Sequence, residues 1–158
     1  MKRLVIYYSL SGNTKSAAEK IAENLGADLI QIDFVKPLPK GTAGQMFEGG
    51  KQATFGMKPE IKGMPADVSQ YDEIIIGTPI WAGKVASPFN TVFTNKDVCE
   101  KVVAAFTFSG SGDNAGCISK LMKKLPNLKC NVALADSRTK FAPQNEAKLE
   151  KFLEELKA

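Results

Sequence analysis

Apolar residues are concentrated in five short runs that are separated by longer amphipathic stretches. Most of these runs are continuously apolar, which is typical of strands that are covered on both faces. We predict strands at Leu4–Tyr8, Leu29–Asp33, Asp72–Gly77, Lys101–Phe108 and Asn131–Ala135.

Between the runs, apolar residues recur every three or four positions, as they do on one face of a helix. Strands that alternate with helices predict a parallel sheet with helices on both faces. The chain is therefore expected to fold as α/β, a three-layer sandwich, in a single domain over residues 1–158. Helices are predicted at Thr14–Leu25, with Gly26 as the C-terminal cap, and at Pro88–Thr94, Ala115–Leu125 and Leu149–Leu156.

The segment 37–65 follows neither pattern and contains six glycines. A loop of this length is unusual in a compact domain and is often functional. We expect a short helix at Ala43–Phe55, with Met46 and Phe47 as its buried contacts.

Composition narrows the class of protein. The chain is 44% hydrophobic and 24% charged, as is ordinary for a globular protein. Its first apolar run is too short for a signal-peptide core or a membrane span, so a cytoplasmic location is expected. Three widely spaced cysteines indicate reduced thiols rather than a disulfide framework.

Charge and the missing histidine exclude several functions. The formal charge of +4 comes from scattered lysines, which favours a solvated surface and predicts neither a nucleic-acid nor a membrane partner. Without histidine, the chain cannot build a Ser-His-Asp or Cys-His nucleophile or a histidine-ligated metal site. The motifs GxGxxG, GxxxxGK(S/T) and GxSxG are also absent, which disfavours a dinucleotide fingerprint, a P-loop and a nucleophile elbow.

Ligands of open parallel sheets bind beyond the carboxyl ends of the strands, so the loops that follow strands are the candidate site. The first loop runs from Ser9 to Thr14 and leads directly into a helix, whose unpaired N–H groups point at it. Three hydroxyl side chains and a glycine in this loop are consistent with a phosphate site or with an ordinary capped helix start.

Two further loops follow strands. Gly77–Lys84 holds the only tryptophan of the chain, which could border a flat aromatic ligand or simply pack. Phe108–Gly116 contains three glycines that could expose backbone groups to a ligand, or form a flexible turn.

Together these loops resemble those of flavodoxins, and the resemblance covers essentially the whole chain. The first loop matches the phosphate loop of that family. In that motif, two Ser or Thr residues separated by one residue are followed by Gly, any residue and Thr. The resemblance implies a five-stranded sheet of order 2-1-3-4-5 and FMN as the cofactor. It implies that the phosphate is bound by Ser9, Leu10, Ser11, Gly12, Asn13 and Thr14.

By the same resemblance, the second and third loops hold the flavin ring, with Trp81 near its dimethylbenzene end. The ring is bordered by Thr78, Pro79, Ile80, Trp81, Ala82 and Gly83, and its pyrimidine edge meets Ser109, Gly110, Ser111 and Gly112. The chain departs from well-known flavodoxins in two ways. It has no aromatic residue between Ser109 and Leu125 to stack on the flavin, and it is not acidic.

The resemblance implies a carrier of low-potential electrons, which uses the semiquinone and hydroquinone states of FMN and docks a redox protein at the flavin edge. Two alternatives stay open: an NAD(P)H-dependent FMN reductase of a quinone or another small acceptor, and a flavin-binding module that docks without carrying electrons. Cys117 lies just beyond the third loop and is either a buried structural thiol or redox-active.

Overall fold

A computed structural model describes all 158 residues. Its central sheet contains five parallel strands in the order β2-β1-β5-β7-β8, which is the 2-1-3-4-5 order of flavodoxins and confirms the predicted α/β fold class. The strands are β1 (Arg3–Tyr7), β2 (Asp28–Gln31), β5 (Glu73–Trp81), β7 (Val102–Ser109) and β8 (Cys130–Ala135).

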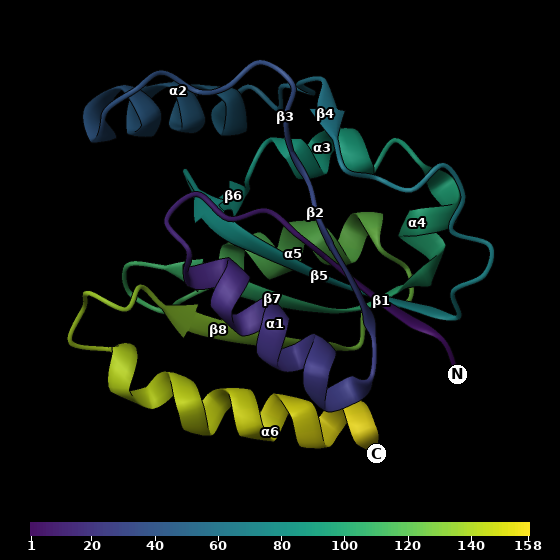
Figure 1. Ribbon diagram of the computed structural model, residues 1–158. Helices are drawn as coiled ribbons and strands as arrows, with labels where there is room; N and C mark the ends of the chain where they lie inside the picture. The colour runs from purple at the N-terminus through teal and green to yellow at the C-terminus, as the bar shows by residue number, and fades with distance from the viewer.

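Helices cover both faces of the sheet (Figure 1). α1 (Asn13–Leu25) and α6 (Asn145–Lys157) pack on one face, and α6 is preceded by a short 3-10 turn, η1 (Ala142–Gln144). The other face carries α3 (Pro88–Val92), α4 (Lys96–Lys101) and α5 (Ala115–Lys124). The sequence predicts α1, α3, α5 and α6 but neither α4 nor η1. None of these helices has the length and hydrophobicity that crossing a bilayer requires.

The predicted second strand is two separate strands. β2 ends at Gln31, and β3 (Asp33–Phe34) then pairs antiparallel with β4 (Ile61–Lys62) in a small second sheet. Gly63 follows β4 with a φ of +101° and lies so close to the backbone of Gln31 that a Cβ atom would stand 2.2 Å from the carbonyl oxygen. Only glycine permits this approach of the two segments.

The third predicted strand is longer than expected, and the prediction that Gly77–Lys84 is a loop is wrong. β5 continues to Trp81, turns at Ala82 and Gly83, and returns as β6 (Lys84–Val85). Both turn residues have positive φ values, 49° and 74°, as a tight two-residue hairpin requires. Proline has no backbone N–H to donate to a neighbouring strand. Pro79 is tolerated in β5 because β5 pairs with β1 only as far as Gly77, so no residue of β1 lies opposite Pro79.

A helix does form within residues 37–65, as predicted, but its orientation differs from the expectation. α2 (Thr42–Thr54) buries Gly49 and Ala53, whereas the side chains of Met46 and Phe47 are 71% and 74% exposed. Figure 1 shows α2 apart from both helical layers, beside β6. The small residues face inward because the helix lies against the flat ring of Trp81.

Candidate functional site

A cavity of about 400 Å³ opens at the carboxyl ends of β1, β5 and β7. All three segments that the sequence singled out contribute to its wall, because β5 lies between β1 and β7 in the sheet. The wall residues from these segments are Leu10, Ser11, Asn13, Thr14, Pro79, Ile80, Trp81, Phe108, Ser109 and Gly110.

The first segment presents the amino end of α1 to the cavity. Gly12 occupies the position before the helix with a φ of +96°, and no side chain caps the helix, so the alternative of a side-chain cap is not realised. The Oγ atom of Ser9 is occupied within the loop, where it accepts a hydrogen bond from the N–H of Gly12 at 3.1 Å. The first N–H groups of α1 are therefore available for an anion, supported by the helix dipole.

The second segment supplies the apolar part of the cavity wall, but Thr78 and Gly83 do not line the cavity. Thr78 is fully buried, and its Oγ1 atom accepts a hydrogen bond from the N–H of Ala86 at 3.0 Å and donates one to the carbonyl of Pro79 at 2.8 Å. Its hydroxyl group thus fixes the base of the β5–β6 hairpin. Ala82 lines a smaller adjoining cavity of about 180 Å³, and Gly83 completes the turn.

Trp81 is held in place by aromatic neighbours. Its ring meets the edge of Tyr8 with centroids 5.5 Å apart, and it is nearly parallel to Phe34 at 6.4 Å. Burial, with the nearby carboxylate of Asp33, raises the pKa of Tyr8 well above its ordinary value, so the phenol stays neutral. The indole of Trp81 is therefore a rigid wall shared by both cavities.

The third segment forms a hydrogen-bonded turn of which only the first three residues reach the cavity, Phe108, Ser109 and Gly110. The hydroxyl group of Ser109 accepts a hydrogen bond from the N–H of Gly112 at 3.0 Å and donates one to the carbonyl of Asp113 at 3.1 Å. Ser111 and Gly112 lie outside the wall, and Gly112 has a φ of +75° that the turn requires.

Sequence reasoning missed two groups of wall residues. Asp136 and Arg138 follow β8, where the rule about strand-end loops would have pointed to them. Two hydrogen bonds from the guanidinium of Arg138, at 2.8 and 3.1 Å, together with its backbone N–H, lower the pKa of Asp136 to about 2. The other group, Thr42, Gln45 and Met46, comes from α2; it lies in the segment 37–65, which the sequence marks as often functional without indicating single residues.

This arrangement fits a ligand with a phosphate and a flat aromatic ring. The free N–H groups at the start of α1 and the hydroxyl groups of Ser11 and Thr14 suit the phosphate, while Ile80 and Trp81 suit the ring. Arg138 offsets the negative charge of Asp136, so the site is not closed to an anion.

Comparison with known proteins agrees with this geometry. A family model described as flavodoxin matches residues 2–155. The chain belongs to the flavodoxin family. The resemblance inferred from the three sequence segments is thereby confirmed.

Solved structures similar to this flavodoxin cover nearly the whole chain. A flavoprotein from Lactobacillus acidophilus, solved in complex with FMN, is 27% identical, with a TM-score of 0.70 over 96% of this chain and 97% of that one. A protein from Bacteroides eggerthii, assigned as a flavoprotein, is 26% identical, with a TM-score of 0.72 over 99% and 98% of the two chains. An archaeal flavodoxin, 18% identical with full coverage of both chains and a TM-score of 0.52, shares the fold.

Proposed function

We propose that this flavodoxin is an electron carrier that uses FMN and exchanges electrons with redox proteins docking at the open edge of the cavity. FMN as the cofactor is supported by membership of the flavodoxin family and by the similar Lactobacillus acidophilus flavoprotein that was solved with FMN. When bound, FMN supplies the redox chemistry, because its flavin ring accepts and releases electrons.

The residues of the chain bind and orient this cofactor. The N–H groups at the start of α1, with Ser11 and Thr14, hold the phosphate, and the rigid indole of Trp81 borders the ring. Ser109 and Gly110 border the ring from β7, with backbone groups to offer its polar edge. Trp81 and Ile80 also exclude water from one side of the ring, and an apolar wall disfavours extra negative charge on the ring.

The observation that carries the proposal is that no residue of the cavity wall can act as a general acid near neutral pH. Among its residues only Asp136 and Arg138 are ionisable, and they bind each other. A general acid needs a pKa near the working pH, whereas the pKa of Asp136 is about 2. Passing electrons through the exposed edge of a flavin requires no such side chain, whereas reduction of a small acceptor benefits from one.

The rim of the cavity offers a docking surface for a redox partner. Leu10 and Met46 line the cavity and are 40% and 71% exposed, and Phe47 beside them is also exposed. Exposed apolar side chains around a cofactor are typical of protein interaction sites. The net charge of +4 favours partners with an acidic surface.

One observation favours a second candidate, an NAD(P)H-dependent FMN reductase of a quinone or another small acceptor. Thr42, Gln45 and Met46 bring α2 to the cavity wall, where they could contact a substrate beside the flavin. Such a contact would give the segment 37–65 a role in specificity.

Anaerobic photoreduction of the FMN-loaded protein tests the proposal, with free FMN as the control. A carrier is expected to accumulate a one-electron-reduced stage in its absorption spectrum and to oxidise NADPH no faster than free FMN. Rapid NADPH oxidation without such a stage would contradict the carrier and support the reductase. Failure to bind FMN would contradict both.

A further inference from the structure

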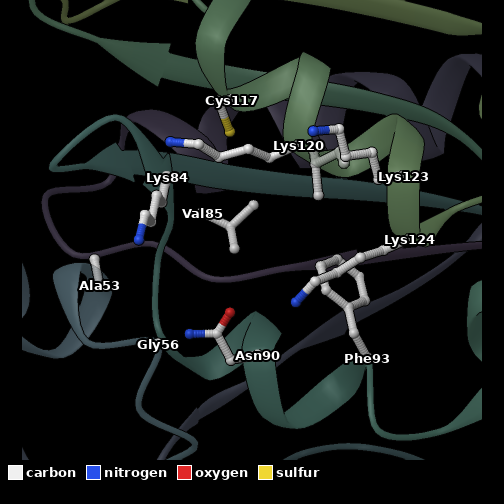
Figure 2. Close-up of a pocket in the computed structure, with 11 residues that line it drawn as sticks. Ala53, Gly56, Lys84, Val85, Asn90, Phe93, Cys117, Lys120, Lys123 and Lys124 are labelled. Atoms are coloured by element: carbon white, nitrogen blue, oxygen red, sulfur yellow. The ribbon is translucent and has the colours of Figure 1, made fainter.

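A second cavity, of about 300 Å³, lies on the sheet face that α3, α4 and α5 cover (Figure 2). It shares no lining residue with the 400 Å³ cavity proposed to hold FMN, called the flavin cavity below, or with the small cavity beside that one. Neither the phosphate nor the ring of FMN therefore accounts for it.

The floor of this cavity is apolar. Val85 of β6 and Cys117 and Leu121 of α5 are buried, and the half-buried ring of Phe93 closes one end. Burial raises the pKa of the Cys117 thiol to about 11, so the sulfur is a neutral, apolar surface at physiological pH. An apolar floor of this kind favours contact with an aromatic or aliphatic group.

The rim of the cavity carries only positive charge. Four of its eleven lining residues are lysines, none is acidic, and none of the four forms an ion pair within 4.0 Å; they are Lys84, Lys120, Lys123 and Lys124. Figure 2 shows Lys84, Lys120 and Lys124 arranged around Val85.

The helix dipole explains only part of this cluster. Lys123 and Lys124 lie in the last turn of α5, where cations are favoured in any protein. Lys120 lies before that turn, and Lys84 belongs to β6. The Nζ atom of Lys84 donates only to the carbonyl of Thr54, at 3.1 Å. Lysines that converge from two elements without a carboxylate leave the cavity with a net charge that a ligand can neutralise.

We propose that this cavity binds a small aromatic carboxylate, with its ring on the apolar floor and its carboxylate at the lysine rim. Charge complementarity defines the anionic group, and Val85, Phe93 and Leu121 define the apolar body. The volume lies at the low end of the range for ligand pockets, about 300–1,000 Å³, which favours a ligand of one or two rings. The proposal is independent of whether the protein is a carrier or a reductase.

Titration of the FMN-loaded protein with 2-naphthoate tests this site, with the isosteric but uncharged 2-naphthamide as the control ligand. Amide NMR shifts are expected at Val85, Phe93 and Leu121, and not at Ser11 or Gly110. Calorimetry is expected to show naphthamide binding about ten-fold more weakly, because it makes no charge-assisted contact with the lysines.

Paired variants test the role of the lysines. Lys120→Gln with Lys124→Gln is expected to weaken naphthoate about ten-fold and to leave naphthamide unchanged. Lys20→Gln with Lys151→Gln removes the same charge from α1 and α6, which pack on the opposite sheet face, and is expected to change neither affinity.

Three outcomes would overturn the proposal. The first is no naphthoate binding up to millimolar concentration. The second is NMR shifts centred on Ser11 and Gly110, which would place the ligand in the flavin cavity. The third is equal binding of naphthoate and naphthamide, or equal weakening of naphthoate binding by both variant pairs. Either result would show that the rim lysines do not contribute to binding of the carboxylate.

Discussion

Gly49 of α2 lies directly on the indole of Trp81: a Cβ atom on Gly49 would stand 3.2 Å from Cε3 of the tryptophan. This distance is tighter than ordinary van der Waals contact, so a larger residue forces the helix and the ring apart. Tyr8 and Phe34 hold Trp81 from other sides, so the ring cannot simply move away. The contact therefore fixes the position of α2 relative to the flavin cavity.

Replacing Gly49 with valine is expected to weaken FMN binding about ten-fold, because the branched side chain displaces α2 or Trp81 from the cavity wall. Quenching of flavin fluorescence during titration with the apoprotein measures the affinity. Gly50→Val is the matched control, since it introduces the same residue into the same helix at a position with nothing within 4 Å of the new Cβ atom. Equal losses in both variants would show that the effect arises from helix propensity.

Thr78→Val is expected to destabilise the protein by about 1–3 kcal/mol, because the buried N–H of Ala86 loses its acceptor. Urea unfolding measures this difference. Thr78→Ser keeps the hydroxyl group and is expected to recover most of the stability. If Thr78→Val unfolds at the same urea concentration as the unmodified protein, the hydrogen bond at the base of the hairpin contributes nothing.

Asp136→Asn is expected to tighten FMN binding about three-fold at low ionic strength, because it removes a negative charge from the cavity proposed to hold the FMN phosphate and frees Arg138. The gain should shrink as salt is added, since the side chain of Arg138 is 79% exposed. Glu150→Gln changes the net charge equally on α6 and serves as the control. A weaker affinity in Asp136→Asn would mean that the carboxylate orients Arg138 toward the phosphate.

The lowered pKa of Asp136 also predicts that the stability of the protein depends on pH in the acidic range. Its pKa in the folded protein, about 2, lies below the ordinary 3.8, mainly because the guanidinium of Arg138 donates hydrogen bonds to it. A carboxylate with a lowered pKa contributes stability that is present above its unfolded value and is lost as pH falls through the folded one. The stability difference between the unmodified protein and Asp136→Asn is therefore expected to change between pH 3.8 and about 2, and to be constant above that window.

The three cysteines are expected to react with thiol reagents at different rates. Burial raises the pKa of Cys117 to about 11, and burial with a hydrogen bond to Glu155 raises that of Cys130 to about 12. Cys99 is half-buried, and its pKa is raised less. A disulfide reagent at pH 8 should label Cys99 first, and all three only after unfolding. Fast labelling of Cys117 in the folded protein would instead support a redox role for it.

The pattern of apolar residues was sufficient to predict the sheet and most of the helices, because both faces of a parallel sheet must be buried. The pattern did not predict where β5 ends, because that depends on backbone pairing with the neighbouring strand rather than on side chains. Pro79 is not a typical strand residue, yet β5 continues through it because β7 remains paired with β5 there. Local sequence does not report whether a neighbouring strand is still present.

The candidate site could be predicted from the sequence only in part, for a similar reason. Strand-end loops were the right place to search, but Thr78 is buried and Ser111 is exposed, and this difference depends on tertiary contacts. The helix at 43–55 was expected to bury Met46 and Phe47, since large apolar residues usually face a core. Instead, α2 packs against the flat ring of Trp81 through the face that carries its small residues. The spacing of apolar residues along the helix does not indicate this face.

α2 contributes to the flavin cavity and to the lysine-rimmed cavity. Thr42, Gln45 and Met46 near its amino end line the flavin cavity, and Ala53 at its carboxyl end lines the lysine-rimmed one. Ligands in the two cavities would therefore contact the same helix, and thermodynamic linkage makes any coupling between them reciprocal. Any factor by which an aromatic carboxylate changes the affinity for FMN is the factor by which FMN changes the affinity for the carboxylate. If α2 couples the two cavities, the fraction of the protein that carries FMN would depend on the concentration of a ligand that does not contact the flavin.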